Sequence, residues 1–304
     1  MNLSKEIFST LAYFEIFKYP LSEAELYTFL QHNTISFDEF SKQARIVSAE
    51  PDSLFCMQGG YYMIKPADGK VDARLQKEKH AGKFWKIARF MTALIARFPF
   101  VRAVMITGSL SKNCADSNSD LDFMVICAKN RLWISKSLLM LFKKLFLFNS
   151  YKYFCINYFI AEDCLEITDR NIFTATELAT VKIAYNTELV MKFISVNSWI
   201  TDYLPNYKSG DSLCHSSTFS PIEKQSYLQI FLEKLIPQAF AEKLNIKLMN
   251  IYINHYRRKY CNLPEEEFND MFTLSVGISR IHPGNMQEKI LYSYKLLLDK
   301  YNIK

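Results

Sequence analysis

The sequence has few of the residues that interrupt helices. Its 304 residues include only 8 glycines and 9 prolines, whereas leucine, isoleucine, lysine and glutamate recur throughout. Because glycine and proline are the residues least compatible with a helix interior, we expect helices to dominate. Hydrophobic residues make up 49% and charged residues 22% of the chain, which excludes a disordered polymer and is typical of a globular protein with a sizeable core.

Paired cysteines and closely spaced histidines are also missing. The seven cysteines stand singly, no Cys-x-x-Cys occurs, and no two histidines have the spacing of metal ligands. This excludes a disulfide framework and a zinc site, and we interpret the cysteines as buried free thiols of a reducing compartment. The first residues, with Lys5, Glu6 and Glu15, lack the pattern of a secretory signal. We therefore expect a cytoplasmic protein.

No apolar run is long enough to cross a bilayer. The most hydrophobic segment, residues 132–148, is interrupted by Lys136, Lys143 and Lys144. It falls short of the roughly 20 apolar residues of a spanning helix, so we predict a core helix and no membrane partner. The net charge of +6 suits an anionic ligand such as a nucleotide but does not by itself indicate nucleic-acid binding.

Residues 1–68 are predicted to form three short helices and a β-hairpin. Apolar residues at helical spacing mark the first helix. Ser22 and Ser36 each stand three residues before a glutamate, the spacing of a capping box that begins a helix. Two aromatic runs on either side of Gly59-Gly60 predict the hairpin. This order of elements resembles a winged-helix domain.

Winged-helix domains often bind DNA through the third helix. Here that helix has only Lys42 and Arg45, which are offset by Asp38 and Glu39. With so weak a basic face, we expect a scaffolding or protein-contacting role and keep DNA binding as a weakly supported alternative.

The remaining chain divides into a mixed part, residues 69–170, and a C-terminal part, residues 171–304. The mixed part is predicted to contain a short mixed sheet, with a long basic helix at 73–98, strands at 101–107, 121–127 and 153–160, and a helix at 131–148. The C-terminal part is predicted to be an almost wholly helical domain, with helices at 174–205 (broken near Asn197), 221–260 (interrupted at Pro237) and 285–301, and a polar break at 215–220. The predicted fold class is therefore α+β.

The stretch VMITGSLSKNCADSNSDLDFMVI, residues 104–126, places polar residues between two predicted strands. Gly108 allows a sharp turn and the close approach of a phosphate, and Ser109 adds a hydroxyl donor. Asp120 and Asp122 have the alternate spacing that puts both side chains on one face of a strand. Two carboxylates so placed can hold hard cations that bridge to triphosphate oxygens.

This arrangement resembles the polymerase-β-type nucleotidyltransferase superfamily. There, an apolar strand ends at Gly-Ser or Gly-Gly, and Asp-x-Asp follows about ten residues later in a second strand. The resemblance implies that Gly108 and Ser109 bind the triphosphate of a nucleotide. It also implies that Asp120 and Asp122 coordinate a divalent metal, normally Mg²⁺ or else Mn²⁺.

Two further positions follow the same pattern. Lys112 stands where many bacterial members carry an arginine, and the resemblance implies that it contacts phosphate. The alternative is that Lys112 is a solvated lysine. Asn113 replaces a glycine of the pattern. A longer resemblance, to uncharacterised bacterial proteins with a winged-helix-like domain before the nucleotidyltransferase domain, is carried by LAYFEIFKYPLSEAEL (11–26), FPFVRAVMITGSLS (98–111), NIFTATELA (171–179) and NSWITDYLPN (197–206).

One part of the expected site is missing. Active members of the superfamily usually carry a third carboxylate on the next strand, but residues 153–160 contain no acid, and Asn157 is the closest equivalent. An amide oxygen can bind a metal but is a very poor base. Glu162 and Asp163 follow at the strand end, roughly 17–20 Å away along an extended chain. We therefore predict that the third carboxylate is absent.

The sequence thus predicts a metal-dependent nucleotidyltransferase that moves NMP from an NTP to a hydroxyl of a protein, a small molecule or an RNA. The alternatives are a catalytically impaired nucleotide-binding or regulatory module, because of Asn157, and a winged-helix DNA-binding regulator. The basic cluster at residues 254–260 either binds acceptor phosphates or forms a solvated helix end.

Overall fold

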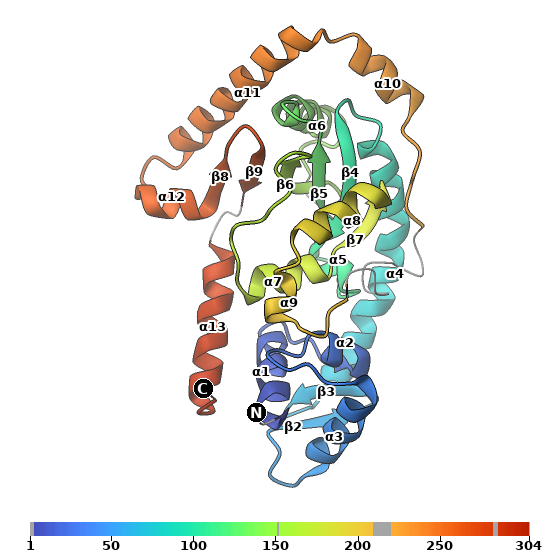
Figure 1. Ribbon diagram of the computed structural model, residues 1–304, viewed down its shortest axis with the longest axis vertical. Helices are drawn as coiled ribbons and strands as arrows, with labels where there is room; N and C mark the ends of the chain where they lie inside the picture. Colours follow the sequence, from blue (N-terminus) through green and yellow to red (C-terminus); the bar gives the residue numbers. More distant parts are fainter. Residues whose placement is uncertain (1–2, 151, 209–219, 282–284, 304) are drawn as a thin grey trace.

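The computed structural model describes residues 3–150, 152–208, 220–281 and 285–303, and its fold is α+β, as predicted (Figure 1). Among these residues it contains a three-stranded sheet in the N-terminal part and a six-stranded sheet in the centre. Cys214 and residues 215–219 of the predicted polar break lie outside the described residues. No described helix combines the length and the hydrophobicity needed to cross a membrane.

The N-terminal part has the predicted three helices and hairpin. Its elements are α1 (Leu3–Glu15), β1 (Leu21–Ser22), α2 (Glu23–Thr28), α3 (Phe37–Ala49), β2 (Phe55–Gln58) and β3 (Tyr61–Ile64). Ser22 forms a complete capping box with Glu25, and the Ser36 side chain caps α3. The two-residue strand β1 adds to the hairpin, giving the order β1-β3-β2.

The central sheet is mixed and has the strand order β7-β4-β5-β6-β9-β8. Its strands are β4 (Val101–Thr107), β5 (Asp122–Cys127), β6 (Cys155–Ala161), β7 (Lys182–Tyr185), β8 (Phe272–Leu274) and β9 (Ile278–Ile281). β5 and β6 are parallel, and the other neighbouring pairs are antiparallel. The three strands predicted from the sequence therefore form the middle of the sheet.

Helices cover both faces of this sheet, and alternate strand residues pack against each layer. Val104, Ile106 and Phe123 share a core with the long helix α4 (Lys70–Ile95) and with α6 (Leu132–Phe146). Met105 and Met124 pack on the other face with α7 (Ile172–Ala179) and α8 (Thr187–Val196). Asp122 belongs to this second face, since it precedes Met124 by two residues on the same strand.

The prediction that the chain after residue 171 is almost wholly helical is wrong for three segments, which form β7 at one edge of the sheet and β9 and β8 at the other side, with β8 as the outer strand. Within the predicted helix 174–205, Lys182–Tyr185 is a fully buried strand that pairs with β4. A four-residue apolar run has no periodicity that separates a buried strand from a helix. Asn186, with a φ of +61°, ends the strand and caps α8. The central sheet therefore takes strands from both sides of residue 171.

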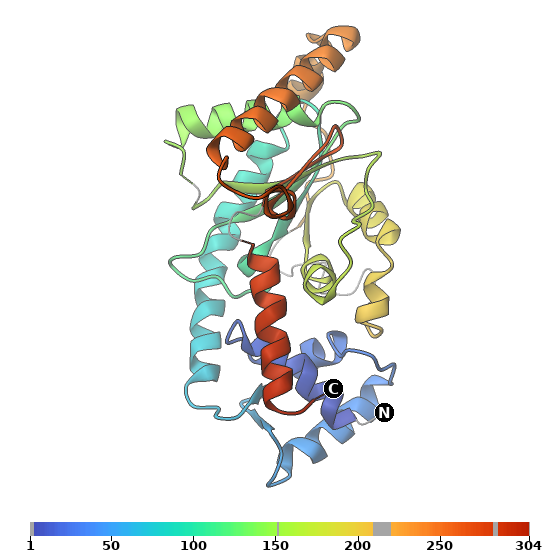
Figure 2. The ribbon, with the colours of Figure 1, turned by 90° about the vertical axis from the view of Figure 1, so that its left-hand side faces the viewer.

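The remaining C-terminal elements are helices, with the predicted breaks at Asn197 and Pro237. They are α9 (Ile200–Tyr203), α10 (Tyr227–Lys234), α11 (Gln238–Lys259), α12 (Glu265–Met271) and α13 (Met286–Lys300). Figures 1 and 2 show α13 running back beside α1. There the rings of Tyr294 and Tyr13 meet edge to face, with centroids 5.6 Å apart.

Lys136 of α6 joins the C-terminal elements to the sheet. Its ammonium donates to the hydroxyl of Ser279 on β9 at 2.6 Å and lies 5.0 Å from the ring centroids of both Trp133 and Tyr252. Burial lowers the pKa of this amine to about 7. The cation–π contacts offset part of the cost of burying it.

The cysteines bear out only part of the expectation. All six described cysteines are free thiols. Cys127 and Cys155 are buried, as predicted, whereas Cys261 is exposed and the other three are partly buried, so the prediction of uniformly buried thiols is wrong.

Arg74 of α4 ties the long helix to the N-terminal part. Its guanidinium donates to the Pro20 carbonyl at 2.9 Å, to Glu25 at 2.9 Å and to Glu78 at 2.6 Å. It also lies 3.8 Å from the ring centroid of Tyr19. Arg74 is only 4% exposed, so these partners replace nearly all of its hydration.

We expect Arg74→Ala to lower the free energy of unfolding by about 3–5 kcal/mol, because it leaves the Glu25 carboxylate without its buried partner. Arg45→Ala is the control, since Arg45 pairs with Glu23 but its side chain is 61% exposed. Urea denaturation of both variants measures the difference. Equal small losses would show that the Arg74 network contributes little to stability.

Candidate functional site

The turn after β4 is built on close packing between Gly108 and Asp122. Thr107 and Asp122 are opposite each other in the β4–β5 ladder, and Gly108 then turns with a φ of +67° into the short helix α5 (Gly108–Ser111). A Cβ atom at Gly108 would lie 2.4 Å from Oδ2 of Asp122. Both the positive φ and this contact require glycine.

The two aspartates differ in environment. Asp122 is partly buried at the start of β5, whereas Asp120 precedes the strand and is exposed. Leu121 between them donates its N–H to the Lys152 carbonyl at 2.9 Å and points into the core shared with α4 and α6. Residues on either side of Leu121 are thereby directed to the opposite face, which agrees with the predicted common face.

Burial of Asp122 has an electrostatic consequence. Loss of hydration raises the pKa of its carboxyl group to about 6, and the negative charge of Asp120 adds to this rise. Hydrogen bonding from Cys155 and the positive charge of Lys112 lower the same pKa but do not cancel the effect. Binding of a proton or a cation to the Asp122 carboxylate would therefore stabilise the folded site.

Asn157 lies beside Asp122. Phe123 pairs with Ile156 and Met124 with Tyr158, so Asn157 is the extra residue of a bulge in β6. Its amide nitrogen donates to Oδ1 of Asp122 at 3.3 Å. The sequence analysis predicted Asn157 as the closest equivalent of a third acid. In the structure the Asn157 amide lies next to the Asp122 carboxylate.

Glu162 and Asp163 are not part of this group. Glu162 accepts the backbone N–H of Lys129 at 3.1 Å, and Asp163 pairs with the Lys129 ammonium at 3.4 Å. Both lie at the far end of β6, as the strand length predicted.

In the basic cluster at residues 254–260, the Arg257 guanidinium donates two hydrogen bonds to the Glu265 carboxylate of α12.

Lys112 is held by an acid that sequence reasoning missed. Its ammonium lies 2.8 Å from the Glu177 carboxylate and 3.3 Å from the Gly108 carbonyl oxygen. Glu177 belongs to α7, where it is the single charged residue of the sequence IFTATELA. An acid in an otherwise apolar helix was the available signal, but nothing local indicated its partner, 65 positions away in the chain.

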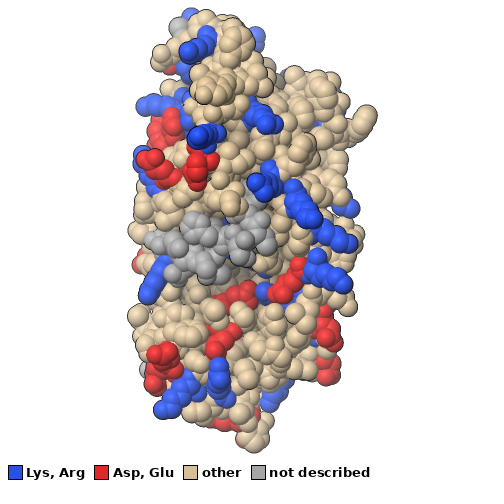
Figure 3. Space-filling view, turned by 90° about the vertical axis from the view of Figure 1, so that its right-hand side faces the viewer, with Lys and Arg blue, Asp and Glu red and all other residues tan. Residues whose placement is uncertain are grey.

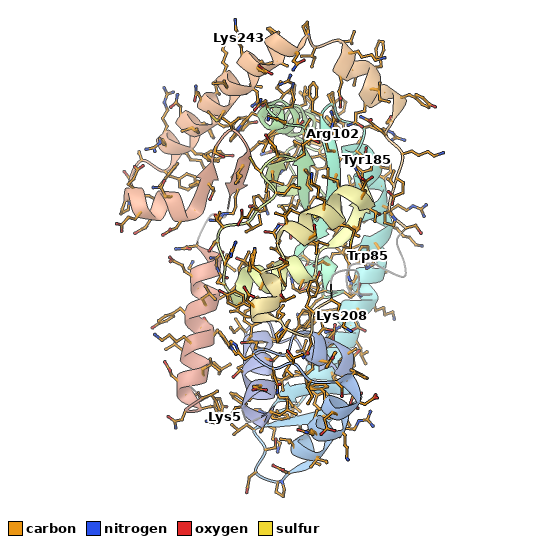
Figure 4. All side chains as sticks on the ribbon, in the orientation of Figure 1. Lys5, Trp85, Arg102, Tyr185, Lys208 and Lys243 are labelled. Atoms are coloured by element: carbon orange, nitrogen blue, oxygen red, sulfur yellow. The ribbon has the colours of Figure 1, made fainter. Side chains whose placement is uncertain are left out.

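Two side chains fix the loop that follows α5. The Tyr19 hydroxyl lies 2.6 Å from the Lys112 carbonyl oxygen, and the indole N–H of Trp85 donates to the Asn113 side chain at 2.8 Å. Figure 4 places Trp85 on α4 at the level of α5. Asn113 has a φ of +52°, a left-handed conformation that asparagine tolerates better than most residues. Asp116 caps the next turn by accepting the Asn118 N–H at 2.9 Å.

A cleft of about 340 Å³ opens next to the turn. It is lined by Gly108, Ser109 and Lys112 and by aromatic residues of α1 and of the segment after it. Lys77 of α4 also contributes to its wall. This volume lies within the range of small-molecule sites, about 300–1,000 Å³.

No protein-family model, curated protein or solved structure matches this chain. Within the described ranges, no three His, Cys, Asp or Glu side chains are close enough together to hold a metal ion by themselves. The chemistry of the site must therefore be inferred from its own side chains.

We expect Asp122→Asn to stabilise the free protein at pH 8 but not at pH 4. The folded pKa of about 6 exceeds the ordinary value of 3.8, so the charged carboxylate destabilises the fold as pH rises from about 4 to about 6 and above. At about 1.4 kcal/mol per pKa unit, the gain is at most about 3 kcal/mol. Urea denaturation at both pH values measures it, with Asp163→Asn, a partly exposed acid outside the site, as the control. A variant less stable than the wild type at pH 8 would contradict this expectation.

Proposed function

We propose that the protein is a cytoplasmic, metal-dependent nucleotidyltransferase that moves NMP from an NTP to a hydroxyl acceptor. In this proposal the N-terminal part is a winged-helix-like domain, residues 69–170 contain the polymerase-β-type core, and the rest is the C-terminal domain. The observation that carries it is the direct packing of the Gly108 turn against the Asp122 carboxylate, which brings a phosphate-binding turn and an acid to one point.

The side chains at this point fit Mg²⁺ or Mn²⁺. Such ions are commonly held by one or two carboxylates and completed by substrate phosphates, so a preformed cage of three protein acids is not required. Asp120 and Asp122 would hold the ion, and the Asn157 amide oxygen could add a ligand after rotation of the amide. When bound, the ion would neutralise the triphosphate for in-line attack. Ser109 would donate to the phosphates.

Incubation with labelled NTPs and Mg²⁺ or Mn²⁺, alone and with lysate, tests this proposal. We expect label transfer and a nucleotide-induced rise in melting temperature, both lost in the Asp120→Ala/Asp122→Ala double variant. Asp163→Ala is the matched control, since that acid pairs with Lys129 outside the site. Absence of transfer, together with no thermal shift that depends on the two aspartates, would refute the proposal.

A second candidate is a nucleotide-binding module without transfer activity. The contact between the Asn157 amide and Asp122 favours it, because an amide cannot take the proton from an acceptor hydroxyl.

Asn157→Asp distinguishes the two candidates. If the wild type only binds nucleotide for want of a third carboxylate, we expect this variant to gain transfer activity or metal affinity, measured by label transfer and Mn²⁺ titration. If the wild type is an enzyme whose metal site is complete with Asn157, the added charge should not increase its rate. Asn157→Ala controls for loss of the amide.

DNA binding receives little support from the described residues. Arg45, one of the two basic residues of α3, is paired with Glu23 at 3.0 Å. In the lower part of Figure 3, where the N-terminal part lies, lysine and arginine side chains are interspersed with acidic ones. The DNA-binding regulator therefore remains a third and weaker proposal.

A further inference from the structure

We infer that the cleft beside the Gly108 turn binds the base of the nucleoside triphosphate, with Phe17 as the ring on which the base stacks. This inference rests on the proposed function and adds the part of the ligand that the metal site does not recognise. The cleft is shared by two regions of the chain, because the end of α1 and the segment after it supply its aromatic wall, whereas α5 supplies polar lining residues.

Phe17 is the accessible ring of the aromatic wall. Among the four aromatic residues that line the cleft, Tyr13, Phe14 and Tyr19 are at most 5% exposed, whereas Phe17 is 37% exposed. The ring of Tyr19 is covered by the Arg74 guanidinium at 3.8 Å. Phe17 therefore offers free aromatic surface inside a concave site.

The position of Phe17 is fixed before any ligand arrives. Its N–H donates to the Phe14 carbonyl at 3.1 Å, in the turn that ends α1. Its ring meets the buried ring of Tyr13 edge to face, with centroids 5.6 Å apart. A ring held in this way loses little conformational entropy when a base stacks on it.

Other residues that line the cleft suit phosphate. Ser109 and Lys77 line it, and Lys77 forms no salt bridge with a described residue. Two acids line it as well, but Glu177 pairs with Lys112 and Asp116 caps its own turn. The cleft thus brings aromatic rings together with a cation and a hydroxyl, which matches the base and the phosphates of a nucleotide.

Stacking also predicts the specificity of the site. Every base has a π-face, so an aromatic platform binds bases with little regard to sequence. We expect ATP, GTP, CTP and UTP to bind with similar affinity, and sodium tripolyphosphate, which has no base, to bind more weakly.

Isothermal titration of the full chain in MgCl₂ with these four NTPs and with tripolyphosphate tests the inference. Phe17→Ala should weaken NTP binding by roughly 5- to 100-fold and leave tripolyphosphate binding unchanged. Phe37→Ala is the matched control, because Phe37 is 42% exposed, meets Tyr27 edge to face and lies outside the cleft. Urea denaturation checks that both variants fold.

The outcomes separate this inference from the proposed function. If Phe17→Ala binds NTPs like the wild type while Asp120→Ala/Asp122→Ala does not, the stacking inference is wrong and the metal site stands. If Phe17→Ala alone loses affinity, the base site stands without the metal site. If the wild type binds neither NTP nor tripolyphosphate, both are wrong.

Discussion

The contact between the Gly108 backbone and the Asp122 carboxylate is the constraint around which the candidate site is arranged. It follows from the β4–β5 ladder, in which Thr107 and Asp122 are opposite each other. A side chain at position 108 would overlap the carboxylate. The turn and the acid therefore occupy one place because strand pairing puts them there.

The charged Asp122 carboxylate lowers the stability of the folded protein, which is a common property of functional groups. A carboxylate buried beside a second acid is a cost to the folded protein unless a proton or a cation relieves it, and such groups are concentrated at functional sites. The Asn157 amide donates only a long hydrogen bond of 3.3 Å to Asp122. An acid in place of Asn157 would increase the charge repulsion with Asp122. It would also be a better proton acceptor than the amide. Under the proposed function, this single position therefore distinguishes a nucleotide-transferring enzyme from a nucleotide-binding module.

Distant segments hold the loop beside the site in place. Tyr19 comes from the N-terminal part, Trp85 from α4 and Glu177 from α7, and each contacts the segment from Lys112 to Asn113. Arg74 fixes Tyr19 and α4 to each other. The N-terminal part is thus more than an appended module, because it supplies both a restraint on the loop and one wall of the cleft.

The sequence by itself determined the elements whose signals are local. Periodicity and capping identified the N-terminal helices and α4, α6 and α13, and the apolar runs on either side of the Gly-Ser turn identified β4 and β5. The spacing of Asp120 and Asp122 predicted that both side chains lie on one face of the strand. Only the tertiary structure decided that β7, β8 and β9 complete the sheet, because runs of three or four residues become strands through pairing with an existing edge. It alone also joined Glu177 to Lys112 and Tyr19 to the loop, since contacts across 65 and 93 positions leave no trace in local spacing.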